Sequence, residues 1–149
     1  MAIELRVQLD SATALLAALG VRLDSSDDLL APALPVVAAA IERNFDEEGW
    51  PVPWAPLSAR YAAYKARRFG AGLRILERSG ALRRSISTRL EGGALVASTD
   101  APYAAFHQYG TRRLPARPFL TLTETDNEEV AQAVADSLGT AYRVPGTSP

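Results

Sequence analysis

The chain has 149 residues, is 48% hydrophobic and carries a net charge of −1. This length is typical of one domain with a core, and we expect a single domain over residues 1–140 followed by a loose tail over residues 141–149. The near-neutral balance gives no global charge that would favour nucleic acid or a membrane surface. Cysteine is absent, which excludes a disulfide framework and a thiolate metal site.

The sequence also argues against secretion and against membrane insertion. MAIELRVQLD at the N-terminus lacks a basic start followed by an apolar run, so it predicts no signal peptide. The longest apolar run, residues 29–41, contains two prolines and falls short of the ~20 residues that a membrane helix needs. We therefore expect a soluble intracellular protein with no membrane contact.

Charge is distributed unevenly along the chain. Residues 1–59 carry 3 basic and 9 acidic residues, residues 60–117 carry 12 and 3, and residues 118–149 carry 1 and 5. Opposite segments can pair inside one fold, or a basic face of one copy can meet an acidic face of the next. An unevenly charged surface that is simply solvated is the plainer interpretation.

The N-terminal third predicts a strand followed by helices. Apolar and polar residues alternate over residues 3–9, as in a strand with one buried face. A capped helix over residues 11–19 follows, and a second runs from residue 25 to about residue 46. Pro35 suits a first helical turn, whereas Pro32 predicts either a break or a kink.

A proline-rich loop, DEEGWPVPWAPLS, separates this helix from the next. We expect Trp50 and Trp54 to anchor the loop by burying their rings. Ser58 is placed to cap a helix over residues 59–68, and Ser79 is placed to cap a short helix after it.

The remaining pattern predicts a hairpin and two helices. Residues 86–90 and 94–98 alternate on either side of a Gly-Gly turn, which is typical of a hairpin. A short helix is expected over residues 102–110, and a final helix begins at a Thr125/Glu128 capping box and ends at Gly139. The fold class is therefore α+β, with a small antiparallel sheet packed against several helices.

Catalytic and metal-binding patterns are weak. His107 is the only histidine, and a lone histidine on an apolar helix face is usually structural. The G-x-S-x-G elbow of serine hydrolases and the P-loop of nucleotide-binding proteins are both absent from the sequence. We expect no enzyme activity, no cofactor and no metal site.

Nucleic-acid binding remains an alternative function. The central segment combines basic side chains with Tyr61, Tyr64 and Phe69, a composition suited to single-stranded nucleic acid. These residues are spread over two short helices and a loop, and they match no DNA-reading motif. The alternative is a small nucleic-acid-binding protein that uses the basic central segment.

Protein contact is the third interpretation, centred on the stretch from Tyr103 to Leu120. Prolines stiffen the loop that carries its arginines, which lowers the entropy lost on docking, and Arg and Phe are typical of interface hot spots. The candidate interface residues are Trp54, Tyr103, His107, Arg112, Arg113, Arg117 and Phe119. The alternative is that Phe119 folds into the core and the arginines are solvated. For Arg117 we expect a partner's carboxylate or, alternatively, a cluster of buried carbonyls.

Four segments carry a family resemblance: WAPLS (54–58), ILERSGALRRSI (75–86), YAAFHQYGT (103–111) and PARPFL (115–120). In this order and spacing, across roughly residues 43–138, the sequence resembles the phage virion morphogenesis family. One departure is the FGAG region, residues 69–72, where relatives often carry a longer lysine-rich linker.

The resemblance implies a structural protein that closes the head-proximal end of a phage tail and helps join tail to head. It implies a homo-oligomeric ring, for which we expect a hexamer. The partners it implies are the tail tube or tail terminator protein, the head–tail connector proteins, and, through non-specific contact, the genomic DNA in the channel. The expected location is the tail or neck of the virion, and the host cytoplasm during assembly.

Overall fold

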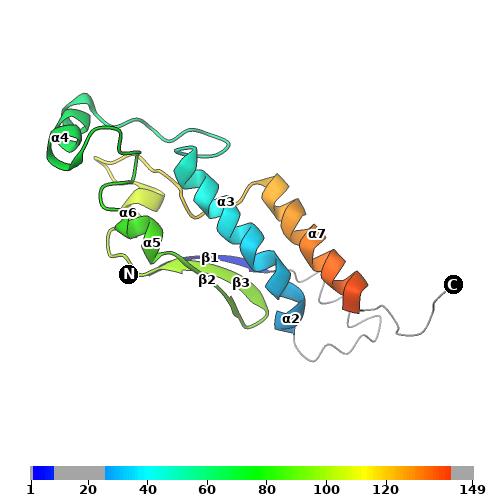
Figure 1. Cartoon of the computed structure of the whole chain (residues 1–149). Helices are drawn as coiled ribbons and strands as arrows, with labels where there is room; N and C mark the ends of the chain where they lie inside the picture. The colour runs from blue at the N-terminus through cyan, green and yellow to red at the C-terminus, as the bar shows by residue number, and fades with distance from the viewer. Residues whose placement is uncertain (1, 9–25, 142–149) are drawn as a thin grey trace.

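The computed structural model describes residues 2–8 and 26–141 (Figure 1). In this part of the chain, β1 (Ile3–Gln8), β2 (Ser87–Glu91) and β3 (Ala94–Thr99) form an antiparallel sheet in the order β1-β3-β2. The predicted α+β class and the predicted hairpin are confirmed. The helix predicted over residues 11–19 and most of the predicted tail lie outside the described residues.

The register of the sheet separates an apolar face from a charged one. Ile3 pairs with Thr99, and Leu90 pairs with Leu95. Because successive side chains of a strand point to opposite faces, Ile3, Leu90 and Leu95 share one face, which packs into the core. Val96 of the central strand is also buried, on the opposite face. The opposite face carries ion pairs between the outer strands, including one from Arg6 to Glu91 at 3.6 Å.

The predicted helix over residues 25–46 forms as three consecutive pieces. These are α2 (Ser26–Leu30), a 3₁₀ turn η1 (Ala31–Ala33) and α3 (Leu34–Asp46). Pro32 lies in the 3₁₀ turn, and Pro35 lies in the first turn of α3 as predicted, where its missing N–H costs nothing. The apolar face of α3 then covers the sheet (Figure 1).

Helix α7 (Glu124–Ala141) packs beside α3 and η1 (Figure 1). Val130 and Val134 are buried in the shared core, one turn apart. The predicted end at Gly139 is wrong, since the helix continues to Ala141. Glycine is tolerated inside a helix at a cost of about 1 kcal/mol relative to alanine.

The capping box of α7 forms two residues earlier than Thr125/Glu128, the predicted pair. The Thr123 hydroxyl accepts from the Asp126 N–H at 3.2 Å, and the Asp126 carboxylate accepts from the Thr123 N–H at 2.7 Å. The same carboxylate pairs with Arg43 of α3. A tertiary contact therefore selects between two local patterns that both fit a capping box.

Three short helices complete the described chain: α4 (Ala59–Phe69), α5 (Ala81–Ser85) and α6 (Ala104–Tyr109). Ser58 caps α4 as predicted, whereas Gly80, and not Ser79, occupies the N-cap of α5. Helix α6 begins two residues later than expected.

The loop before α4 is anchored by only one of its two tryptophans. Trp54 is buried against Phe45 with an edge-to-face geometry. Trp50 is 46% exposed, with Arg43 over its ring, so the expectation that its ring is buried is wrong.

Candidate protein-binding groove

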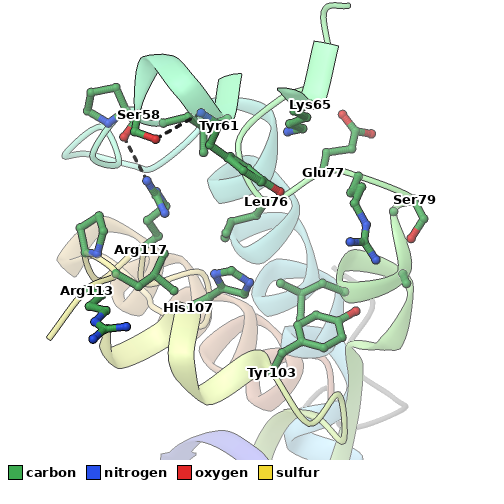
Figure 2. Close-up of a pocket in the computed structure, with 18 residues that line it drawn as sticks. Ser58, Tyr61, Lys65, Leu76, Glu77, Ser79, Tyr103, His107, Arg113 and Arg117 are labelled. Atoms are coloured by element: carbon green, nitrogen blue, oxygen red, sulfur yellow. Dashed lines mark hydrogen bonds between the residues drawn. The ribbon is translucent and has the colours of Figure 1, made fainter. Parts of the chain in front are cut away.

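A groove of about 580 Å³ lies where four segments meet. Its walls are α4 and the preceding residues 56–58, the segment 76–82, the start of α6 with His107, and residues 113–117 (Figure 2). The size is within the usual range of ligand-binding clefts. Four of the seven predicted interface residues line it: Tyr103, His107, Arg113 and Arg117.

The chain that leaves the groove at Arg117, residues 117–121, is held mainly by side chains. Gln108 accepts from the Phe119 and Leu120 N–H groups and donates to the Leu120 carbonyl. Asn44 donates to the carbonyls of Phe119 and Thr121. The Trp54 indole N–H donates to the Pro118 carbonyl at 2.9 Å. Side chains thus satisfy backbone groups of Phe119 and Leu120, which are buried outside any sheet.

Arg117 is 3% exposed and has no carboxylate partner among the described residues. Its Nε donates to the Ala55 carbonyl at 2.8 Å, and its Nη2 donates to the Pro56 carbonyl at 3.1 Å. Burial lowers the pKa of the guanidinium below its usual value. The structure therefore shows a cluster of carbonyls, which was the alternative partner expected for Arg117. These two hydrogen bonds use only part of the donor capacity of the guanidinium.

Lys65, the only buried residue of α4, is a second buried cation at the groove. Its Nζ donates to the backbone carbonyls of Leu73 and Arg74. Burial lowers the pKa of Lys65, and the nearby carboxylates of Glu77 and Glu48 act against that shift. The amino group thus ties α4 to the chain that follows it.

His107 points into the groove between Tyr103 and Arg117 (Figure 2). Its ring lies 6.0 Å from the Tyr103 ring in an edge-to-face contact. Burial and then the charge of Arg117 lower the pKa of His107, so the imidazole is neutral at pH 7. Its Nδ1 is buried without a hydrogen-bond partner among the described residues.

The other predicted interface residues divide into exposed and buried positions. Arg112 and Arg113 are exposed on the loop after α6. Phe119 is completely buried, and its ring centroid lies 5.7 Å from that of Phe45. This is the alternative given for Phe119, that it folds into the core. Trp54 is also in the core, so both rings support the groove from beneath and do not line its surface.

Helix α4 projects from the body of the molecule (Figure 1). Apart from Lys65, each of its residues is exposed. Tyr61 and Tyr64 are in ring contact, and Tyr64 also contacts Phe69, which lies under the guanidinium of Arg78. An isolated helix of this length is only marginally stable in water. The exposed aromatic side chains of α4 form the kind of apolar surface at which a partner binds.

Surface charges that form no ion pair with described residues include basic ones on α4 and acidic ones on α7, which are two different helices. Arg74 and Arg83 pair with Asp46, so part of the charge pattern is internal. The arginines of α4 make no ion pair with described residues, and neither do the exposed Glu124, Glu128 and Glu129 of α7. Helix α4 lies at one end of the molecule, and α7 lies apart from it, beside α3 (Figure 1).

Sequence reasoning missed Lys65, which lines the groove, and Gln108, which holds the backbone of Phe119 and Leu120. In the sequence, Lys65 is one of several basic residues in a segment expected to be solvated. It is buried because the chain after α4 turns back and places the Leu73 and Arg74 carbonyls beside its amino group. Gln108 carries no signal beyond its place in α6. No helix in the described part of the chain is long and apolar enough to cross a membrane.

Comparison with known proteins gives a consistent result. The model of the phage virion morphogenesis family matches residues 4–139. Over 105 residues the sequence is 28% identical to the "Mu-like prophage FluMu G protein 2" of Haemophilus influenzae, covering 66% of this chain and 67% of that protein. No solved structure matches.

Proposed function

Because this chain belongs to the phage virion morphogenesis family, we propose that it closes the head-proximal end of a phage tail and helps join the tail to the head. In this role it acts in the tail or neck of the virion as a ring of identical subunits, with a hexamer as the expected ring. The tail tube or tail terminator on one side and the head–tail connector on the other are its proposed partners.

The observation that carries the proposal is the separation of unpaired charge between α4 and α7. Arg67 and Arg68 are exposed at the end of α4. Glu128 and Glu129 are exposed on α7, a separate helix that packs beside α3 (Figure 1). Two unlike, complementary faces favour a head-to-tail contact between copies. Such a contact forms a ring when its rotation closes.

A charge swap tests the contact between copies. We expect Arg67→Glu/Arg68→Glu and Glu128→Arg/Glu129→Arg each to weaken self-association in sedimentation, and a mixture of the two variants to associate again. Arg84→Glu, an exposed change of the same sign on α5, is the control. If the mixture associates no better than either variant alone, these faces do not meet.

Salt gives an independent test of the same contact. Raising ionic strength from 0.05 to 0.5 M shortens the Debye length from about 14 Å to about 4 Å. Association through exposed charges should weaken over this range, which light scattering can follow. Unchanged or stronger association would indicate an apolar interface instead.

Head–tail joining is tested in the virion. Phage made without this protein should yield separate heads and tails, and adding back the purified protein should restore joined particles. Electron microscopy of particles carrying a labelled copy should place the label at the head-proximal end of the tail. A label found at the distal end, or joined particles made without the protein, would reject the proposal.

The exposed basic and aromatic side chains of α4 favour one second candidate, a small nucleic-acid-binding protein. Such a surface can stack on bases and contact phosphates. Fluorescence anisotropy with a single-stranded oligonucleotide tests it. Binding that is lost in Tyr61→Ala/Tyr64→Ala, in a chain that does not self-associate, would favour this candidate over the ring.

A further inference from the structure

We propose that the groove between α4 and α6 is a binding site for an extended acidic segment of another virion protein, with a carboxylate held against Arg117 and Lys65. The inference rests on the proposed assembly role for the choice of a protein as the partner. The site itself is argued from the groove.

The groove carries a net positive charge. Lys65, Arg78, Arg113 and Arg117 line it, and Glu77 is the single acidic residue among the lining residues. Lys65 and Arg117 are 4% and 3% exposed and are held by carbonyls. Glu77 and Glu48 offset the burial of Lys65 only in part, and Arg117 pairs with no carboxylate of the described residues. Because a buried cation that lacks a full counter-charge is costly, a carboxylate that enters the groove gains a charge-assisted contact.

The groove also has an apolar lining. Leu57, Leu76, Leu82 and Leu114 contribute to the walls, and Tyr61 and Tyr103 are exposed at the site. A small free anion would leave this apolar surface uncovered. A peptide that alternates acidic and apolar side chains covers both kinds of wall, as in pockets that read alternate residues of an extended chain.

The depth of the groove bears on whether a peptide or a nucleic acid binds there. The two buried cations are recessed, and phosphates of a duplex lie on a convex surface that does not reach into a groove of this size. Exposed arginines outside the groove, such as Arg67 and Arg112, are better placed for phosphate contact. The recess therefore disfavours a duplex, and the leucine side chains of the walls favour the aliphatic side chains of a protein segment over a single strand.

His107 makes the proposal measurable in the full-length chain. It is the only histidine of the sequence, so after removal of any tag the imidazole signals in an NMR spectrum belong to one residue in the groove. The probe is a capped peptide that alternates glutamate and leucine. We expect it to shift the His107 signals saturably, whereas a lysine–leucine peptide of the same length should leave them unchanged.

Variants separate binding from folding. Lys65→Met keeps the length of the side chain and removes its charge, and it should weaken peptide binding about tenfold or more. Arg113→Gln, on the exposed side of the groove, should also weaken it in a chain that melts normally. Arg112→Gln, at an exposed arginine outside the groove, is the matched control and should bind as wild type does.

Each remaining outcome counts against the inference. No response of His107 to the glutamate–leucine peptide would overturn it. An equal response to inorganic phosphate would assign the site to small anions, and a stronger response to a single-stranded oligonucleotide would assign it to nucleic acid. Sedimentation of the same samples measures self-association, so a failed groove and a failed ring are distinguished.

Discussion

Replacing Asp126 by alanine should lower stability more than any exposed change on α7. Asp126 is 2% exposed, its carboxylate completes the capping box with Thr123, and it pairs with Arg43. Loss of a cap costs about 1 kcal/mol. Loss of a hydrogen bond to a charged group costs about 1.5–3 kcal/mol. We therefore expect Asp126→Ala to lose about 3 kcal/mol, or about 6–12 °C in Tm for a chain of this size.

The acid limb of the pH profile tests the charge itself. Burial alone would raise the pKa of Asp126, but hydrogen bonds from the Thr123 backbone and from Arg43 outweigh it, and the net effect is a pKa below the usual 3.8. A depressed pKa contributes stability above the unfolded value, and that stability is lost as pH falls through the folded value. Asp126→Asn should therefore differ from wild type at pH 6 and converge with it well below pH 3.8.

The measurement is thermal or urea unfolding of both variants beside Glu128→Ala, an exposed change on the same helix. The control should stay within about 0.5 kcal/mol of wild type. A Tm for Asp126→Ala within about 1 °C of wild type would refute the reasoning. A difference between wild type and Asp126→Asn that is constant with pH would refute the ionic part alone.

Three further changes test the groove and its support by thermal melting. Gly110→Ala should destabilise by about 1–3 kcal/mol, because φ is +72° and a Cβ would lie 2.7 Å from the Ala116 nitrogen; Gly139→Ala, with no atom within 4 Å, is the control and a lower Tm there would contradict us. Trp54→Ala should cost about 3–5 kcal/mol, and the exposed Trp50→Ala much less; equal losses would reject the assigned roles. Arg117→Lys should cost about 1–3 kcal/mol, since lysine lacks the fork that reaches two carbonyls, and an unchanged Tm would contradict this.

The sequence predicted those features that depend on local periodicity. The alternation in β1, the four-residue steps of Val37, Ile41 and Phe45 in α3, and the Gly-Gly turn of the hairpin each reflect one face turned toward a core. These patterns repeat within a few residues, so they can be read without knowing the rest of the fold.

Features decided by distant contacts could not be predicted in this way. Both Thr123/Asp126 and Thr125/Glu128 fit a capping box, and Arg43 decides between them. Trp50 and Trp54 lie in the same loop, yet only Trp54 finds Phe45 and the Pro118 carbonyl. Lys65 is buried because it donates to the carbonyls of Leu73 and Arg74. These follow a turn after α4 whose path the sequence does not specify.

The groove shows the same division. Tyr103, His107, Arg113 and Arg117 were singled out by residue type and converge on one cavity. Their neighbours from α4 and residues 76–82 come from segments far away in sequence. Local patterns therefore identified one wall of the candidate site, and the opposite wall required the fold.

The pairing of β1 with β3 affects how the chain is made. Ile3 lies opposite Thr99, so the first strand leaves the ribosome long before its partner does. At a synthesis rate of 5–20 residues per second, the wait is on the order of 5–20 seconds. During that time an alternating apolar strand is exposed with an unpaired edge, which is the kind of segment that aggregates or recruits chaperones. We expect nascent chains stalled before β3 emerges to leave β1 open to protease, and chains stalled well after Thr99 to protect it.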